Sequence, residues 1–216
     1  MPLELAAGVV DVWRVDLGTE ADDPPPPVLS PDEDARAARF RDPHDGERWR
    51  RTRAALRCLL AEYLDADPRE LILETASHGK PFLAEPASSL RFNVSHAGTV
   101  ALLAFASGTE VGIDVEVRSR RFDAVALARQ AFGEAYARTV RGLSPDRREE
   151  AFLHAWVRHE AIVKCLGAGL AAPAPDATDV WVTGLDVARG AVAALAARRG
   201  PCSIRSREYS VVAQSR

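Results

Sequence analysis

The apolar run from Leu90 to Ala106 constrains the fold of this chain more than any other segment. It is long enough for two buried strands, and Ala97-Gly98 interrupts it where a turn would join them. Val111 to Val117 alternates strictly between apolar and other residues, as a further strand does. Hairpins and predicted helices interleave without a βαβ rhythm, so the sequence favours an α+β fold over a doubly wound parallel sheet.

Helix signals flank this region. Ser30, Pro31 and Glu33 predict a helix start, with Ser30 as the cap and Glu33 completing a capping box. The other predicted helices span about Asp45–Tyr63, Ala124–Phe132 and Arg148–Leu166, the last ended by Gly167 and Gly169. The other predicted strands are Val9–Leu17, Leu71–Leu73, Val180–Val187, Ala191–Ala197 and Ser203–Ala213.

Composition excludes several classes of protein. Of 216 residues, 47% are hydrophobic, which is enough to bury a sizeable core. A net charge of −3 argues against a generic nucleic-acid binder, and no stretch approaches the roughly 20 apolar residues of a membrane helix. The first residues show no basic region followed by an apolar run, so we expect no secretory signal, and the three scattered cysteines suit a reducing compartment. We therefore expect a soluble cytoplasmic protein without nucleic-acid or membrane partners.

Two carboxylates lie on the clearest predicted strand. Side chains alternate between the faces of a strand, so Asp114 and Glu116 share one face, roughly 7 Å apart along it. A pair of this kind can bind a hard cation. The alternative is an ordinary exposed polar face on a half-buried strand, and this segment alone favours that alternative.

The predicted helix after Arg148 carries a second charged pair. Glu160 and Lys164 are four residues apart and therefore lie on neighbouring turns of one face. Their face continues the apolar stripe of Leu153 and Val157, which favours a position facing a cleft. The alternative is an ordinary ion pair on the surface of the helix. His159 interrupts another apolar stripe, where a core histidine is the alternative to a ligand contact.

Cations also lie at predicted turns. Only two of the 28 Lys and Arg side chains are lysines, Lys80 and Lys164. Pro81 biases Lys80 towards an extended backbone, and Ser95-His96 directly precedes the predicted hairpin turn. A plain surface turn and a simple hairpin cap are the respective alternatives.

Eight arginines lie between Arg36 and Arg57, interleaved with Phe40 and Trp49. Their helical spacing spreads them over more than one face, and nearby acidic residues dilute the patch. Selected arginines that bind a small phosphorylated ligand are favoured over nucleic-acid binding, because the guanidinium fork matches phosphate geometry.

Taken together and in this order, three segments resemble the 4′-phosphopantetheinyl transferases of the surfactin-synthetase type. The segments are Phe92-Asn93-Val94-Ser95-His96, Gly112-Ile113-Asp114-Val115-Glu116 and Trp156 through Lys164 with Gly167-Ala168-Gly169-Leu170 after it, and Gly79-Lys80-Pro81 adds to them. The resemblance covers about residues 30–170. It implies two similar α/β halves, residues 1–108 and 109–216, related by a pseudo-twofold with the active site in the cleft between them.

The resemblance also implies a reaction. Members of this family transfer 4′-phosphopantetheine from coenzyme A to a serine of an apo acyl, polyketide or peptidyl carrier protein, with Mg²⁺, and release 3′,5′-adenosine diphosphate. The expected metal ligands are Asp114, Glu116 and Glu160, and the expected catalytic residues are Glu160, Lys164 and His96. The expected coenzyme A contacts are Arg36, Arg48, Lys80, Pro81, Ser95, His96, His159 and Lys164.

One position departs from the family pattern. The family usually has Lys directly before the helix Glu, and this chain has His159, so we expect Arg158 to compensate for the missing charge. We expect a monomer that acts in secondary metabolite biosynthesis. A carrier docking surface is expected among Arg118, Arg120, Arg121 and Arg129, with the loop from Pro173 to Asp176 shaping it.

Two rival functions fit the same residues. Three carboxylates with a lysine and a histidine also describe a Mg²⁺-dependent phosphohydrolase acting on a nucleotide or coenzyme A. A non-catalytic coenzyme A-binding module, with structural acidic residues, is the second rival.

Overall fold

The structure is a computed structural model, and it describes residues 3–18, 24–118, 121–168, 177–187 and 190–210. The helices of these ranges are α1 (Pro31–Ala38), α2 (Pro43–Leu64), α3 (Ala124–Gly142) and α4 (Pro145–Leu166). The strands are β1 (Val9–Asp16), β2 (Ile72–Thr75), β3 (Pro81–Glu85), β4 (Leu90–Ala97), β5 (Val100–Ser107), β6 (Val111–Val117), β7 (Val180–Leu185), β8 (Ala191–Arg198) and β9 (Ser203–Tyr209). Helices interleave with mainly antiparallel strands, which confirms the predicted α+β class.

The larger sheet has the strand order β4-β5-β1-β9. The predicted hairpin is confirmed: β4 and β5 pair antiparallel from Leu90 opposite Ser107 to Ala97 opposite Val100. β1 pairs antiparallel with β5 and parallel with β9, so a strand from the end of the chain completes the sheet that β1 begins. If the chain is divided after residue 108, β9 belongs to the second half by sequence but to the sheet of the first half by its pairing with β1.

A second sheet has the order β6-β8-β7, and β2 with β3 forms a separate two-stranded sheet. The predicted strand at Leu71–Leu73 begins one residue later than expected, and β3 was not predicted. The predicted last strand ends at Tyr209, and its remaining part from residue 211 lies outside the described residues.

The helix termini follow the sequence signals closely. Ser30 Oγ accepts a hydrogen bond from the Glu33 amide, and Glu33 Oε2 accepts one from the Ser30 amide, so the capping box forms as predicted. α4 ends at Gly167 in the left-handed region, with φ of 65°. α3 runs ten residues beyond the predicted Phe132, with a non-helical Gly133 inside it. Among the described helices, none is long and apolar enough to span a membrane.

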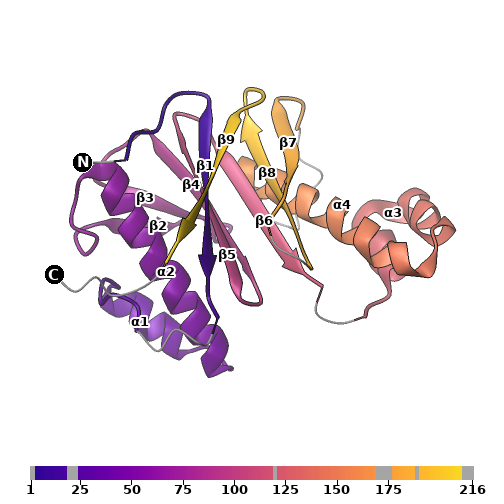
Figure 1. The fold of residues 1–216 in the computed structure, drawn as a ribbon, viewed down its shortest axis with the longest axis horizontal. Helices are drawn as coiled ribbons and strands as arrows, with labels where there is room; N and C mark the ends of the chain where they lie inside the picture. Colours follow the sequence, from indigo (N-terminus) through magenta and orange to yellow (C-terminus); the bar gives the residue numbers. More distant parts are fainter. Residues whose placement is uncertain (1–2, 19–23, 119–120, 169–176, 188–189, 211–216) are drawn as a thin grey trace.

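The elements stack in four layers, with a helix on each outer face (Figure 1). One core lies between α2 and the larger sheet, and it includes Leu56, Leu59 and Phe105. A second core lies between the two sheets, where alternate residues of β1 and β5 meet those of β6 and β8. α4 packs on the opposite face of β6 and β8, and α3 packs against α4. Two hydrogen bonds join the edge strand β4 of the larger sheet to the edge strand β6 of the second sheet. Asn93 Oδ1 accepts one from the Ile113 amide, and Ser95 Oγ accepts the other from the Val115 amide.

Candidate active site

Asp114 lies in a buried polar cluster that joins β4, β6 and α4. Asp114 Oδ1 accepts hydrogen bonds from Ser95 Oγ at 2.9 Å and from Lys164 Nζ at 2.6 Å. Lys164 Nζ also donates to Ser95 Oγ at 3.2 Å. Asp114 is only 4% exposed, so the alternative of an ordinary solvated polar face is wrong for this residue. The structure brings together one residue from each of the three sequence segments.

Gly112 allows this close approach. It lies on the same face of β6 as Asp114, and a Cβ atom there would overlap the carbonyl oxygen of Ala161 and the amide nitrogen of Cys165. Only a glycine lets β6 lie directly against α4 at this level. Glu160 and Lys164 flank these contacts on α4, so the close packing brings the helix charges to the strand carboxylates.

The carboxylates of the cluster repel one another. Burial raises the pKa of Glu116, and the charge of Asp114 adds to that rise against a Trp156 hydrogen bond and the attraction of Lys164. Burial likewise raises the pKa of Glu160, with Asp114 and Glu116 adding to the rise and Lys164 opposing it. Asp114 Oδ2 and Glu160 Oε1 are buried and have no hydrogen-bond partner among the described residues. One ammonium therefore leaves negative charge in the cluster unbalanced.

This donor set fits a hard divalent cation in its chemistry. A bound cation would give the unpartnered carboxylate oxygens a partner and would lower the raised pKa values of Glu116 and Glu160. Carboxylate oxygen is also the ligand that Mg²⁺ prefers. Within the described ranges, however, no three His, Cys, Asp or Glu side chains are gathered closely enough to form a metal site. Lys164 instead neutralises Asp114 directly.

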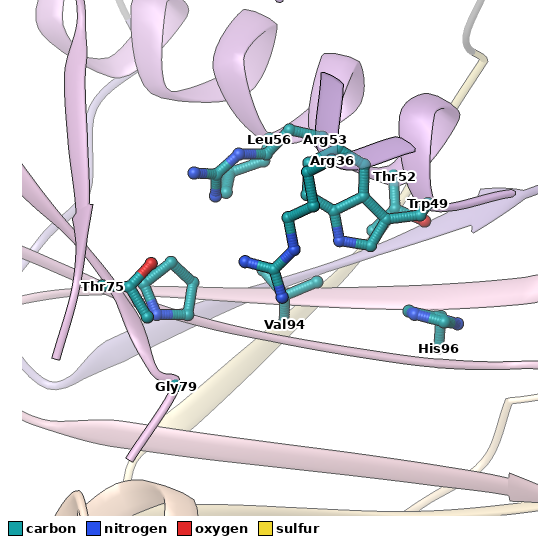
Figure 2. Close-up of a pocket in the computed structure, with 10 residues that line it drawn as sticks. Arg36, Trp49, Thr52, Arg53, Leu56, Thr75, Gly79, Val94 and His96 are labelled. Carbon is teal, nitrogen blue, oxygen red and sulfur yellow. The ribbon is translucent and has the colours of Figure 1, made fainter. Parts of the chain in front are cut away.

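A cavity of about 230 Å³ lies on the other face of β4 (Figure 2). Because side chains alternate along the strand, Val94 and His96 face this cavity while Asn93 and Ser95 face β6. We call it the arginine pocket. Its lining residues are Arg36, Trp49, Thr52, Arg53, Leu56, Thr75, Gly79, Pro81, Val94 and His96.

Trp49 and Arg53 line the arginine pocket, although no role was predicted for either residue. Trp49 lies beneath two guanidinium groups, with Arg36 5.3 Å and Arg53 6.0 Å from its ring centroid. Figure 2 shows Arg36 and Trp49 side by side above Val94. Arg53 also pairs with Glu33 Oε1 at 2.5 Å, which fixes its direction. Helical spacing offered a signal, since Arg36 belongs to α1 and Trp49 and Arg53 lie four residues apart on α2.

Four other predicted contacts have mixed placements. His96 lines the pocket, and partial desolvation there together with the charges of Lys164 and Arg48 lowers its pKa, with Asp45 opposing the shift. Arg48 pairs with Asp45 at 3.0 Å and is absent from the pocket lining. Pro81 lines the pocket, but Lys80 Nζ donates to Glu110 Oε2 at 2.9 Å and to the Val111 carbonyl at 3.1 Å. Its ammonium is thus directed at the start of β6.

His159 lies in a different hollow from the arginine pocket. It lines a groove of about 620 Å³ between α3, α4 and the end of β6, beside Glu116. Its ring meets Phe132 edge-on at 5.6 Å and lies 6.0 Å from Trp156. Arg158 donates to the Val182 carbonyl on β7 at 3.4 Å, so the structure does not bring it to this groove as a substitute cation.

Comparison with known families places the chain. Residues 27–108 match the model of the N-terminal part of 4′-phosphopantetheinyl transferases, and residues 110–212 match the 4′-phosphopantetheinyl transferase superfamily. HetI of Nostoc sp., a 4′-phosphopantetheinyl transferase, is 33% identical over 177 residues, which cover 78% of this chain and 73% of HetI. The chain belongs to the 4′-phosphopantetheinyl transferase superfamily. This confirms the superfamily predicted from the sequence, a superfamily of transferase enzymes, whereas the surfactin-synthetase type stays a prediction.

Two further relatives of the superfamily match a smaller share of their length. The 4′-phosphopantetheinyl transferase psf-1 of Bacillus pumilus is 30% identical over 144 residues, covering 67% of this chain and 60% of psf-1. A Synechocystis sp. protein is 32% identical over 144 residues, covering 66% of this chain and 58% of that protein. The chain thus spans about three fifths of the length of these two relatives. Both relatives are named as 4′-phosphopantetheinyl transferases.

Proposed function

We propose that this chain transfers 4′-phosphopantetheine from coenzyme A to a serine of an apo carrier protein, and that it is of the surfactin-synthetase type. The observation that carries the proposal is the cluster around Asp114. There, two buried carboxylate oxygens that have no hydrogen-bond partner among the described residues lie beside the ammonium of Lys164, where β4 of the larger sheet meets β6 of the second sheet. Such a combination suits a diphosphate, its cation and an attacking hydroxyl group together.

The arginine pocket and the groove at His159 lie on two sides of the cluster and support an orientation of coenzyme A in the site. The arginine pocket offers Arg36 and Arg53 for phosphate and Trp49 as an aromatic surface, as the adenosine half of coenzyme A requires. The groove at His159 lies across β6 and offers an apolar wall on the carrier side. We propose that coenzyme A lies in the cleft of two pseudo-twofold halves, residues 1–108 and 109–216, each with a long helix over a sheet.

The chemistry is a displacement at phosphorus. The carrier serine forms a new P–O bond to the phosphate of phosphopantetheine while the pyrophosphate P–O bond breaks and 3′,5′-adenosine diphosphate leaves. Glu160 takes the serine proton, since its Oε1 is buried beside the cluster and has no hydrogen-bond partner among the described residues. Lys164 and Ser95 hold the transferring phosphate. Asp114, Glu116 and Glu160 would hold Mg²⁺ once these side chains draw together around it, and the ion would supply positive charge to the leaving diphosphate.

Carrier docking is proposed on the arginines near the groove. Arg118 and Arg129 are half-exposed and pair with Glu149 and Glu134. Arg120 and the loop from Pro173 to Asp176 lie outside the described residues. Charge reversal of Arg118 and Arg129 should raise the KM for a carrier protein and leave the KM for coenzyme A unchanged, as measured by steady-state kinetics. Unchanged carrier kinetics would remove this surface from the proposal.

A direct assay tests the proposed function. The protein is incubated with coenzyme A, Mg²⁺ and a panel of apo fatty acid, polyketide and peptide carrier proteins, and mass spectrometry detects added phosphopantetheine. We expect at least one carrier to be modified on serine. The absence of modification on every carrier by folded protein would contradict the proposal.

Matched variants separate the rival functions. Glu160→Gln should abolish transfer, whereas Glu150→Gln, an exposed position of the same helix, should retain it. Breakdown of coenzyme A without a carrier would favour a phosphohydrolase. Binding of coenzyme A without turnover, unaffected by Glu160→Gln, would favour a binding module.

A further inference from the structure

One wall of the arginine pocket belongs to a structure with little support of its own. Thr75, Gly79 and Pro81 line the pocket from the β2–β3 hairpin. This hairpin is a separate two-stranded sheet, and an isolated two-stranded hairpin is marginally stable in water. Leu73 and Leu83 pack against the core, while the outward residues are exposed. The turn that carries the pocket wall therefore needs another anchor.

Lys80 provides a connection at that turn. Gly79 and Pro81, its neighbours in the chain, line the pocket, yet the Lys80 ammonium contacts Glu110 Oε2 and the Val111 carbonyl instead. The Lys80 side chain is 16% exposed and that of Glu110 is 40% exposed, so solvent reaches this ion pair from the Glu110 side only in part. The ammonium thus links the hairpin to the strand that carries Asp114.

Glu110 is held in place independently of Lys80. Its carbonyl oxygen accepts a hydrogen bond from the Arg198 amide at 3.0 Å and from Cys165 Sγ, on α4, at 3.2 Å. Its other carboxylate oxygen, Oε1, lies 3.0 Å from Arg91 Nε on β4. The backbone of Glu110 is therefore fixed by β8 and α4, and Arg91 orients its carboxylate, so that the carboxylate is already in position to bind the ammonium at the turn.

We propose that Lys80 and Glu110 are positioning residues that hold the hairpin wall of the arginine pocket in place for its ligand. Lys80 acts through Glu110 and is not itself a phosphate ligand. This inference rests on the proposed function for the identity of the ligand, the adenosine diphosphate half of coenzyme A. Loss of the ion pair loosens the wall and weakens binding, while the cluster at Asp114 keeps its own contacts.

A double-mutant cycle tests the proposal. Lys80→Met, Glu110→Gln and the double variant are compared for the KM of coenzyme A, for kcat, and for the dissociation constant of 3′,5′-adenosine diphosphate by calorimetry. We expect each single variant to raise the KM and the dissociation constant roughly fivefold, or about 1 kcal/mol, with little change in kcat. The double variant should be no worse than either single variant, since both remove one interaction.

A different pattern would overturn the proposal. If Lys80 binds phosphate, Lys80→Met weakens binding but Glu110→Gln leaves it unchanged or tightens it, because the competing carboxylate is gone. A fall in kcat with an unchanged KM would equally contradict a wall-holding role. Neutralising the neighbouring surface pair with Arg198→Met or Asp179→Asn is the control, and it should change neither constant.

Hydrogen exchange separates this inference from the proposed function. In the free protein, Lys80→Met and Glu110→Gln should each speed amide exchange in residues 72–85 and leave residues 111–117 protected. This measurement needs no ligand, so it decides the role of the ion pair even if the wild-type protein transfers nothing. Unchanged exchange in the hairpin of both variants would refute the proposal.

Discussion

Lys164 is a compact cation in a confined place. Its ammonium lies between Asp114 Oδ1 and Ser95 Oγ, at 2.6 and 3.2 Å. A guanidinium is planar, larger and not readily deprotonated, so it cannot reproduce both of these short contacts while following a transferring phosphate and giving up a proton. We expect Lys164→Arg to lower kcat by roughly tenfold or more, a barrier increase of at least about 1.4 kcal/mol, in the carrier-modification assay.

The control for this variant lies on the same helix. Arg147→Lys exchanges the same two residue types in the opposite direction, at an exposed position of α4, and should retain the wild-type rate. Circular dichroism should show that both variants are folded. A Lys164→Arg enzyme with the wild-type kcat would show that only the charge at this position matters.

The sequence indicated which residues carry the chemistry better than it indicated their partners. Strand alternation and helix spacing predicted the common faces of Asp114 with Glu116 and of Glu160 with Lys164, and the structure brings the two faces together. Neither pattern could show that Lys164 pairs with Asp114 or that Lys80 pairs with Glu110. Those pairs join segments 50 and 30 residues apart, and only the packing of separate elements determines them.

At the scale of elements, the contact between β6 and α4 depends on the absence of a side chain. We expect Gly112→Ala to lower the free energy of unfolding by at least about 2 kcal/mol, because the added methyl overlaps the helix backbone. The same displacement separates Lys164 from Asp114, so kcat should fall as well. Denaturant unfolding and the transfer assay measure the two effects.

Gly142→Ala is the matched control, since a Cβ atom there meets nothing within 4 Å. This variant at the end of α3 should have nearly wild-type stability and rate. Equal stability of Gly112→Ala and Gly142→Ala would contradict the close packing of β6 and α4.

The start of α1 is joined to α2 by a buried carboxylate. Burial alone would raise the pKa of Glu33, but hydrogen bonds from Arg57, Ser30 and Arg53, with the charge of Arg53, outweigh it and lower the pKa. A lowered folded-state pKa stabilises the fold above the unfolded-state value and loses that contribution as the pH falls through the folded-state value. Glu33→Gln should cost roughly 3 kcal/mol at pH 7 and much less in strong acid.

Urea unfolding at a series of pH values measures this difference. Asp32→Asn, an exposed acidic residue of the same helical turn, is the control and should cost only a few tenths of a kcal/mol. A Glu33→Gln penalty that did not shrink in acid would contradict the lowered pKa of Glu33.

Elements with local signals were predictable, and those defined by distant partners were less so. Caps and alternation located α1, α4, β4, β5 and β6 to within a few residues. β3 was missed because its five residues, Pro81–Glu85, show no strong alternation and pair only with the exposed β2. Local patterns also could not show that β9 would join β1, because strand pairing depends on the whole fold.

For the whole molecule, Asp11 connects the two ends of the chain. It is fully buried on β1 and accepts hydrogen bonds from the Tyr63 hydroxyl at 2.6 Å and from Arg205 Nε, on β9, at 2.5 Å. We expect Asp11→Ala to lower the free energy of unfolding by about 2 kcal/mol, since it removes a fully buried charged acceptor from the half-buried Tyr63 hydroxyl and the Arg205 guanidinium. Chemical denaturation measures the loss.

A second pair between the same strands is the control. Arg14 and Glu208 form an exposed ion pair, and Glu208→Ala should cost less than about 1 kcal/mol. If Asp11→Ala cost no more than Glu208→Ala, the buried connection would not stabilise the junction of β1 with β9.

The parallel pairing of β1 with β9 also has a consequence for synthesis. Val9 pairs with Ser203, so β1 has its final neighbour only after residues 203–209 have left the ribosome. Until then β1 has an unpaired edge, which can pair with another chain. The larger sheet is therefore completed about 190 residues after β1 is made, and in the interval this edge is a site where nascent chains can associate.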